Sequence, residues 1–220
     1  MSGPVKRRGY DSPVRRARAA ATRSAILDAA ERRFVRDGYA ATPVAEVARE
    51  AGVSPRTVHL AFGTKPGLLR ALWNARLRGD EEPVPVGERP WFRAVLEEPD
   101  PERAIRLNAR NARAVRGRVG ALLEVIRDAA PADPEIADLW ARIQREFHDN
   151  QRAVVAALHE RGALRPGLAP ARAADILWTL NHPDVHRLLV TERGWTPAEH
   201  ERWLVDALRC ALLGRAPRRR

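Results

Sequence analysis

The sequence predicts an all-α protein, with a small N-terminal domain of three helices followed by a larger helical domain. Apolar residues recur at spacings of three and four along most of the 220 residues, as on one face of a helix. Ser, Thr or Asp before Pro marks the start of several of these segments, and Gly marks the end of others. Alternating runs rich in Val, Ile and Thr are missing, so no sheet is expected.

Charge is concentrated near the N-terminus. Hydrophobic residues make up 45% of the chain, which allows a core, and the net charge is +11. Residues 1–79 hold 16 Lys and Arg against 6 Asp and Glu, a net of +10, which leaves +1 for residues 80–220. This balance indicates a polyanionic partner, nucleic acid first and an anionic membrane surface second. The second is weaker because the basic residues do not lie opposite a strongly apolar face.

Targeting signals and cysteine content predict a soluble, cytoplasmic protein. No apolar run reaches the ~18 residues of a membrane span, and the basic N-terminus lacks the apolar stretch of a signal peptide. Cys210 is the only cysteine, so no disulfide framework is expected. Because Cys210 lies in an apolar helical run, we expect a buried structural thiol rather than a redox sensor.

We divide the chain into a basic arm over residues 1–20, a helix-turn-helix domain over 21–81 and a larger helical domain over 82–220. The arm is rich in Arg and interrupted by Gly and Pro. It is either a solubilising tail or a segment that reaches phosphates or the minor groove, and both readings stay open.

The helix-turn-helix domain begins with a helix over about 13–36, which ends at Gly38. Thr42 is expected to cap a short second helix, Ser54 is expected to cap a short third helix, and Thr64 is expected to cap a fourth. The side-chain oxygen of Ser or Thr can accept a hydrogen bond from a free backbone N–H at the start of a helix. Pro follows the first two of these caps directly, as is common at the first helical position.

The turn between the second and third helices is Ala51-Gly52-Val53-Ser54. Small residues allow the two helices to cross closely, and the third helix can then enter a major groove. Val58 and Phe62 are expected to face inward. The residues expected at the DNA surface of this helix are Ser54, Pro55, Arg56, Thr57, His59 and Leu60.

The stretch 22–72 resembles the N-terminal domain of TetR-type (tetracycline-repressor) regulators. The matching positions are Ile26 to Ala30, Phe34, Gly38, Tyr39, Thr42, Val47, Ala48, Ala51 to Ser54, Thr57, Phe62, Lys65, Leu68 and Leu69. The remainder of the chain is similar to that family only in being helical and of suitable length.

The resemblance implies a homodimer that places its third helices in the major groove and responds to a small ligand bound in the C-terminal domain. It also implies that Thr42 and Lys65 bind phosphate, and that Arg56, Thr57 and Leu60 lie at the base-reading surface. The family usually has Tyr where this chain has His59, so a backbone contact by His59 is an open question.

Beyond a Pro-rich segment at 80–90, every signal is helical, with helices expected over about 91–96, 101–130, 133–162, 170–180, 183–193 and 197–213. Aromatic and amide side chains there are candidate walls of a ligand pocket, although core packing is the more common role for each aromatic residue taken alone. The candidates are Trp91, Phe92, Asn108, Asn111, Trp140, Phe147 and Trp178.

The last two helices are the expected dimer interface, with core packing within one subunit as the alternative. The candidate residues are Leu188, Leu189, Trp203, Leu204, Ala207 and Ala211. His182 and His186 have the i,i+4 spacing of metal ligands, but Pro183 between them and the lack of a third ligand argue against a metal site. No cofactor or catalytic motif is recognised, so an enzyme is not expected.

These observations predict a ligand-responsive regulator, most simply a repressor that binds a palindromic operator as a dimer and is released by a small-molecule effector. The alternative is a sequence-tolerant architectural DNA-binding protein that depends on its basic arm. Operator sequence, effector and regulated genes are not encoded in any pattern that the sequence offers.

Overall fold

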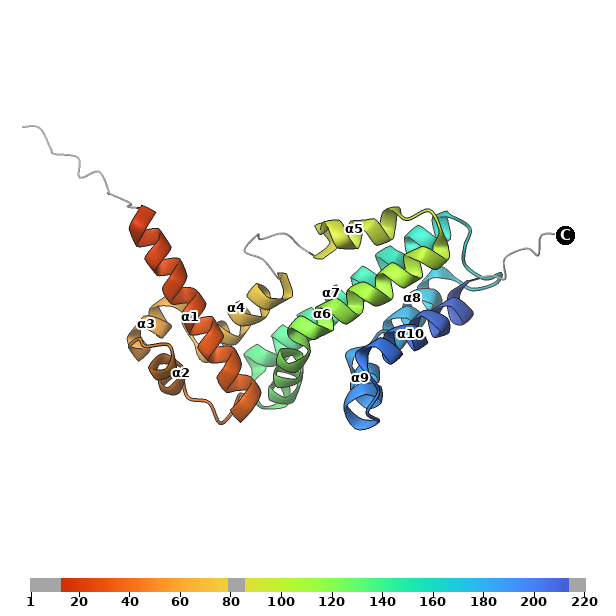
Figure 1. Cartoon of the computed structure of the whole chain (residues 1–220). Coiled ribbons are helices and arrows are strands. Elements are labelled where there is room, and N and C mark those ends of the chain that lie inside the picture. The colour runs from red at the N-terminus through yellow and green to blue at the C-terminus, as the bar shows by residue number, and fades with distance from the viewer. Residues whose placement is uncertain (1–12, 79–85, 214–220) are drawn as a thin grey trace, which may run out of the picture. The chain divides into compact units, whose positions relative to one another are not determined.

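The computed structural model describes residues 13–78 and 86–213, which form two compact units divided between Leu72 and Trp73 (Figure 1). Helices make up both units, and no strand occurs within the two described ranges. An isolated antiparallel bridge joins Leu164 to Leu213. The prediction of an all-α fold is confirmed.

The N-terminal unit contains α1 (Pro13–Asp37), α2 (Val44–Glu50), α3 (Pro55–Phe62) and the first turns of α4 (Lys65–Arg78), which continues into the second unit. Its core brings together apolar residues of all four helices: Ile26, Leu27, Ala29, Ala30, Phe34, Val47, Ala48, Val58, Leu68, Leu69 and Leu72. In α1 the buried positions begin at Ile26, whereas residues 13–25 are exposed apart from half-buried Thr22.

The connection from α1 to α2 differs from the prediction in one respect. Gly38 ends α1 as expected: its φ is 82°, and its N–H donates to the carbonyl of Phe34 at 3.0 Å. The prediction that Thr42 caps α2 is wrong, because the helix begins one residue later and Pro43 stands at the cap position. Thr42 is instead buried, and its hydroxyl donates to the carbonyl of Gly38 at 2.8 Å.

The turn between α2 and α3 is held by backbone hydrogen bonds. The N–H of Val53 donates to the carbonyl of Ala48 at 2.9 Å, and the N–H of Gly52 donates to that of Arg49 at 3.2 Å. This pair of bonds is a Schellman motif, which requires a left-handed residue after the helix. Gly52 supplies it with a φ of 68°, so the glycine predicted at this turn has a specific conformational role.

The C-terminal unit is a bundle of five longer helices with short helical connections. The long helices are α5 (Pro90–Glu97), α6 (Pro101–Ala129), α7 (Pro134–Glu160), α8 (Pro170–Leu180) and α10 (Pro197–Leu212). The short ones are η1 (Val86–Glu88), η2 (Ala130–Ala132), α9 (Pro183–His186) and η3 (Arg187–Glu192). Helices α6 and α7 lie side by side in Figure 1, and α8 and α10 pack against them and against each other.

Side-chain caps set the starts of three of the long helices. Asp100 accepts from the first backbone N–H groups of α6, Asp133 does so for α7, and Thr196 forms a capping box with Glu199 at the start of α10. The helix predicted over 183–193 changes its hydrogen-bonding pattern along its length. It is α-helical as far as His186 and π-helical through η3.

One face of α10 packs into the core of the C-terminal unit. Leu204, Leu208 and Leu212 lie on this face, and none of them is exposed to solvent. Cys210 is two residues beyond Leu208, which in a helix of 3.6 residues per turn places it about 200° away on the opposite face. Its side chain is exposed, so the prediction of a buried thiol is wrong.

Two of the predicted segments fall partly outside the described residues. Of the arm predicted over 1–20, residues 13–20 form the exposed first turns of α1, and the rest lies outside the described ranges. Of the loop predicted over 80–90, only its end is described, as η1 and the start of α5. No helix in the described part of the chain is long and apolar enough to cross a lipid bilayer.

Candidate nucleic-acid interface and ligand cavity

The N-terminal end of α3 is held by its own side chains. Ser54 Oγ accepts a hydrogen bond from the backbone N–H of Thr57 at 3.2 Å, and it lies 2.9 Å from the Thr57 hydroxyl. Pro55 occupies the first helical position, where its missing N–H breaks no helical bond. The Thr57 side chain is half-buried and is already engaged in the cap, so the first turn of α3 is a well-ordered platform.

The outer face of α3 carries Arg56, His59 and Leu60, all of them exposed. Leu60 keeps 76% of its surface in water, which is unusual for a large apolar side chain, while Val58 on the opposite face is 2% exposed. Within the described residues no carboxylate pairs with Arg56. A guanidinium can donate two bonds to guanine, and an apolar side chain can contact the thymine methyl group, so this face suits a major groove.

The two predicted phosphate ligands have different surroundings. The ammonium group of Lys65 lies over the ring of Tyr39, 4.3 Å from its centroid, and donates to the carbonyl of Ala40 at 3.4 Å. These contacts hold Lys65 at the start of α4. Thr42 is buried, and its single hydroxyl hydrogen is directed at Gly38, so a side-chain contact to phosphate requires that bond to break.

The hydrogen bonding of His59 determines what its ring can offer. Its Nδ1 lies 2.9 Å from the carbonyl oxygen of Gly63. Because a carbonyl oxygen only accepts, Nδ1 must carry the hydrogen, and Nε2 of the neutral ring then has only a lone pair. A phosphate oxygen also only accepts. His59 can therefore donate from Nε2 to phosphate only when the ring is protonated.

One residue outside the predicted site supports α3. Phe62, expected to face inward, is half-buried, and the guanidinium of Arg23 covers its ring at 4.4 Å from the centroid. Arg23 also donates to the carbonyl of Ala61 at 3.2 Å. Arg23 thereby links α1 to the end of α3, a role that its place among the many arginines of α1 gave no signal for.

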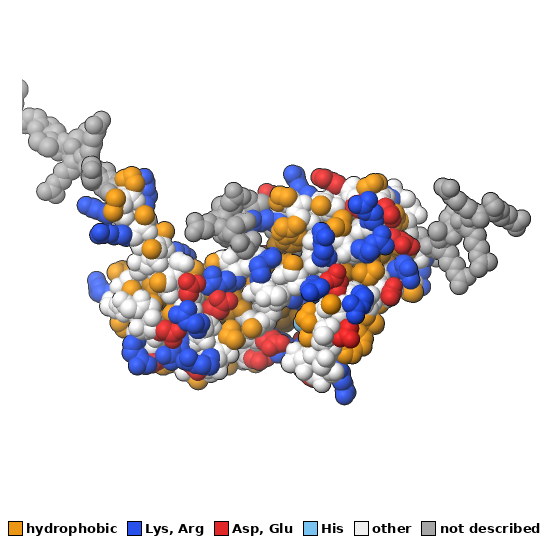
Figure 2. All heavy atoms as spheres, viewed as in Figure 1, with side chains coloured by type: hydrophobic (Ala, Val, Ile, Leu, Met, Phe, Trp, Pro, Cys, Tyr) orange, Lys and Arg blue, Asp and Glu red, His pale blue; other side chains and the backbone are white. Residues whose placement is uncertain are grey.

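The basic residues of α1 fall into two groups. Near its end, Arg32 and Arg33 form ion pairs with Glu50 of α2 at 2.7 and 2.5 Å, so their charge is compensated within the unit. Near its start, Arg15 and Arg18 are exposed, and Figure 2 shows basic side chains standing out along this part of the helix. The first group holds α1 to α2, whereas the second is available to a polyanion.

The C-terminal unit contains a cavity of about 600 Å³. Its walls come from α5, α6, α7, the α9 segment and the final turns of α4 that belong to this unit. A volume of this size is typical of pockets for drug-sized molecules. Six of the seven predicted ligand-pocket residues line it: Trp91, Phe92, Asn108, Asn111, Trp140 and Phe147.

Trp178 is not among the cavity residues. Its ring packs edge-on against His182 at 4.7 Å between centroids, on the side of α8. Asn111 lines the cavity but also donates to the carbonyl of Trp91 at 2.8 Å, so it fixes a wall. Asn108 differs, because its Nδ2 is buried with no hydrogen-bond partner within the described residues.

Sequence reasoning missed the main charged group of the cavity, Arg116 of α6. Its Nη2 donates to the backbone carbonyl of Asn181 at 2.8 Å and to the side-chain oxygen of the same residue. Its Nη1 is buried with no partner among the described residues. Burial lowers the pKa of Arg116 to about 10, so it stays charged at neutral pH.

Two histidines next to this group are held neutral. The rings of His186 and His200 meet edge-on with centroids 4.9 Å apart, and His200 is buried. Burial, reinforced by the positive charge of Arg116, lowers the pKa of each to about 4. The positive charge at this end of the cavity therefore belongs to Arg116 and is not shared with protonated histidines.

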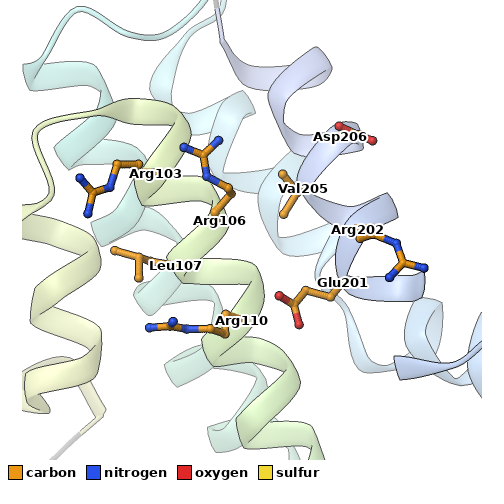
Figure 3. Close-up of a pocket in the computed structure, with 8 residues that line it drawn as sticks. All are labelled: Arg103, Arg106, Leu107, Arg110, Glu201, Arg202, Val205 and Asp206. Carbon is orange, nitrogen blue, oxygen red and sulfur yellow. The ribbon is translucent and has the colours of Figure 1, made fainter. Parts of the chain in front are cut away.

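A second hollow, of about 500 Å³, lies at the surface between α6 and α10 (Figure 3). Charged side chains dominate its walls: Arg103, Arg106, Arg110, Glu201, Arg202 and Asp206, with Leu107 and Val205 between them. A solvated surface of mixed charge suits an apolar molecule poorly, so the inner cavity is the better candidate for a ligand site.

The predicted dimer residues divide by exposure. Leu188 is exposed, at 45%, and Leu189, Trp203, Ala207 and Ala211 are partly exposed. Leu204 is the exception, because its side chain is enclosed in the core of its own subunit. The expectation that Leu204 contacts a partner is corrected on this ground.

His182 and His186 do not form a metal site with any third ligand within the described residues. His182 caps α9: its Nδ1 accepts from the N–H of Asp184 at 3.2 Å, and its Nε2 faces the amide oxygen of Gln144 at 3.2 Å. Both ring nitrogens are thus engaged in holding α9 to α7.

Residues 26–72 match the family model described as "Bacterial regulatory proteins, tetR family". No curated protein matches the chain in sequence. The match therefore covers the described helices from the buried part of α1 to the middle of α4, including the whole helix-turn-helix.

Several solved structures are similar to the whole described fold. NalD of Pseudomonas aeruginosa, described as the secondary repressor of the MexAB-OprM multidrug efflux pump, has a TM-score of 0.70 and 21% identity over 91% of this chain and 100% of that one. A putative tetR-family regulator from Mesorhizobium loti has a TM-score of 0.68 and 23% identity over 89% and 98%. FadR of Bacillus subtilis, a transcriptional regulator in complex with stearoyl-CoA, has a TM-score of 0.67 and 17% identity over 84% and 96%.

Proposed function

We propose that the chain is a DNA-binding transcriptional regulator that acts as a ligand-responsive repressor, because its residues 26–72 match the model of the tetR family of bacterial regulatory proteins. The observation that carries the proposal is the exposed face of α3, where a guanidinium and a large apolar side chain stand on a capped helix. The same chain holds an internal cavity of suitable size for a small effector.

In this proposal α3 enters the major groove, and Arg56, Thr57 and Leu60 meet base edges. Lys65 binds a phosphate beside them, and His59 adds a phosphate contact when its ring is protonated. The exposed basic turns at 13–25 of α1 supply affinity that does not depend on sequence. The proposed phosphate contact of Thr42 depends on the release of its hydroxyl from Gly38.

We propose that the repressor is a homodimer joined through α8, η3 and α10. Large apolar side chains on these elements are partly exposed in the single chain: Ile176, Trp178, Leu180, Leu188, Leu189 and Trp203. The small residues Ala207 and Ala211 on α10 allow close approach of a second copy. Two α3 helices would then occupy half-sites of a palindrome about 34–36 Å apart, or a multiple of that spacing.

The effector is proposed to bind in the cavity and to favour a state of the dimer that no longer matches the operator. Such a switch requires the effector to bind one state more tightly than the other. The stearoyl-CoA complex of the similar FadR structure supports a small-molecule effector in a protein of this fold. Helix α4 joins the two units as one continuous helix, so it is the direct covalent route between them.

Selection of bound DNA from a random pool tests the proposal, followed by affinity measurements for the selected site and for random DNA. We expect a palindromic site and a preference of at least about a thousandfold over random DNA at fixed salt. Arg56→Ala should reduce the binding free energy by about 1–3 kcal/mol on the selected site and by little on random DNA. Lys65→Ala should weaken binding to both DNAs equally, and it should lower the slope of log affinity against log salt concentration by about one.

A preference near one for any selected sequence would favour the sequence-tolerant architectural alternative instead. Equal losses on both DNAs for Arg56→Ala would contradict its proposed base contact. Sedimentation of the full chain at micromolar concentration tests the dimer separately, and a monomer there would reject it.

A further inference from the structure

The cavity of the C-terminal unit has a charge that the protein leaves uncompensated. The guanidinium of Arg116 lines the cavity, and its hydrogen-bond partners among the described residues are two oxygens of one neutral residue, Asn181. No carboxylate forms an ion pair with it among the described residues. Because a buried cation without a counter-ion is costly, such groups are normally paired or bind an anion.

The amides around Arg116 are oriented so that they do not compensate its charge further. Asn181 turns its Nδ2 toward the amide oxygen of Gln151 at 3.4 Å, and Gln151 donates its own Nε2 to the carbonyl of Phe147 at 3.3 Å. The amide N–H groups of Asn181 and Gln151 therefore donate to acceptors within the protein. Arg116 Nη1 is left as a buried donor without an acceptor.

Two other arginines of the cavity lie near carboxylates. Arg127 binds Asp184 at 2.9 Å. Arg142 lies 3.8 Å from Glu146, too far for a hydrogen bond, and its Nε is buried without a partner among the described residues. Glu124 lines the cavity and forms no ion pair with Arg116; it is eight residues after Arg116 on α6, a rise of about 12 Å. Side chains on a helix lean toward its N-terminus, so Arg116 and Glu124 lean the same way and keep this separation along the helix axis.

A second unpartnered donor lies on the side toward which Arg116 leans. Asn108, two turns earlier on α6, lines the same cavity, and its Nδ2 is buried without a hydrogen-bond partner. Unpaired buried donors are rare in proteins, and the described residues that line this cavity hold three, on Arg116, Asn108 and Arg142, which indicates an acceptor that completes them. Between them the walls are aromatic and apolar, including Trp91, Phe92 and Phe147.

We infer that the cavity binds an amphipathic organic anion, whose acidic group is received by Arg116 and whose apolar body lies between the aromatic walls. The inference rests on the proposed effector function of this cavity and narrows it to a chemical class. Arg116 Nη1 donates to the acidic group in a charge-assisted bond, and Asn108 donates to a further polar atom of the ligand. His186 and His200 are neutral and add no positive charge beside Arg116.

Two dyes with the same aromatic rings test the inference. The dye 1-anilinonaphthalene-8-sulfonate carries an acidic group, and N-phenyl-1-naphthylamine lacks it. We expect Arg116→Gln in the full chain to lower the affinity for the anionic dye by about tenfold or more at pH 7.5. The affinity for the neutral dye should change by less than about twofold. The matched control is Arg106→Gln in the surface hollow, which should change neither.

A loss of the same factor for both dyes, or no loss for either, would overturn the inference. A second measurement uses the unaltered chain and does not depend on the fold of a variant. In displacement of the neutral dye, 1-naphthylacetate should act at about a tenfold lower concentration than its neutral amide, and equal concentrations would also overturn the inference. Neither measurement involves DNA, so its failure leaves the DNA-selection result untouched, and failure of operator selection leaves the dye result standing.

Discussion

At the scale of single residues, hydrogen-bond partners determine what a polar side chain can still offer to a ligand. The His59 ring is exposed beside the proposed groove surface, but its Nδ1–H is used by Gly63. Thr42 is likewise committed to Gly38. In both cases the residue type is compatible with phosphate, and the local bond decides under which condition phosphate can be bound.

The proposed phosphate contact of His59 can be tested by removing its ring. If Nε2 donates to phosphate, His59→Ala should weaken binding of the selected site and of random DNA by the same factor, up to about tenfold for each bound subunit, because a phosphate contact carries no sequence information. Fluorescence anisotropy at fixed pH and salt measures both affinities. Unchanged affinity for both DNAs would refute this role.

At the scale of helices, close backbone contacts set the geometry between α3 and α4. The N–H of Gly67 donates to the Thr64 hydroxyl at 3.0 Å, which caps α4. A Cβ added at Gly67 would lie 2.3 Å from the carbonyl oxygen of Phe62 at the end of α3. Since that neighbour is backbone, it can move only if one helix shifts against the other.

Gly67→Ala should therefore destabilise the N-terminal unit by about 1–3 kcal/mol and weaken operator binding. The matched variant is Gly117→Ala in the interior of α6, where an added Cβ meets nothing within 4 Å. It should stabilise the chain by about 0.5–1 kcal/mol, because Ala is the better helix former. Urea denaturation followed by circular dichroism measures both, and changes of the same sign would contradict the steric explanation.

At the scale of the whole molecule, the two units place their positive charge differently. The N-terminal unit exposes basic side chains on α1 and α3, whereas the C-terminal unit holds the guanidinium of Arg116 in its internal cavity. The latter unit also contains His186 and His200, neutral groups in contact with each other and influenced by Arg116. This arrangement couples stability of the C-terminal unit to pH.

Acid should destabilise the C-terminal unit well above the pH at which carboxylates titrate. The pKa of His200 is about 4 in the folded chain against 6.5 ordinarily, so the unfolded chain takes up its proton first as the pH falls. The stability due to neutral His200 is complete above about pH 6.5 and is lost progressively toward pH 4, on the order of 3 kcal/mol for this residue.

Unfolding free energies at pH 7.5, 6 and 4.5 measure this loss. His200→Phe, which keeps an aromatic ring without a titrating group, should lose less stability over that interval than the unaltered chain. The control for the replacement of a histidine as such is His159→Gln at an exposed position of α7, which should change the unfolding free energy at pH 7.5 by less than about 0.5 kcal/mol. Equal slopes for His200→Phe and the unaltered chain would contradict the assignment.

Local chemistry explains why the helices could be predicted closely. Asp100 and Asp133 precede Pro and cap α6 and α7 close to the helix starts predicted at about 101 and 133, since a cap involves only residues within one turn. The exposed face of α3 followed from the same kind of local periodicity. The dimer candidate Leu204 and the thiol of Cys210 were placed wrongly, because the rotation of α10 about its axis depends on what packs against it.

The amino-acid sequence alone determined the helical class, the helix-turn-helix with its capped third helix, and the concentration of basic charge in the DNA-binding part. All of these depend on residues within a few turns of one another. Only the tertiary structure revealed the unpaired Arg116, because its single partner, Asn181, is 65 residues away. A cavity and its charge arise from side chains that meet only after folding, and no spacing along the chain records that meeting.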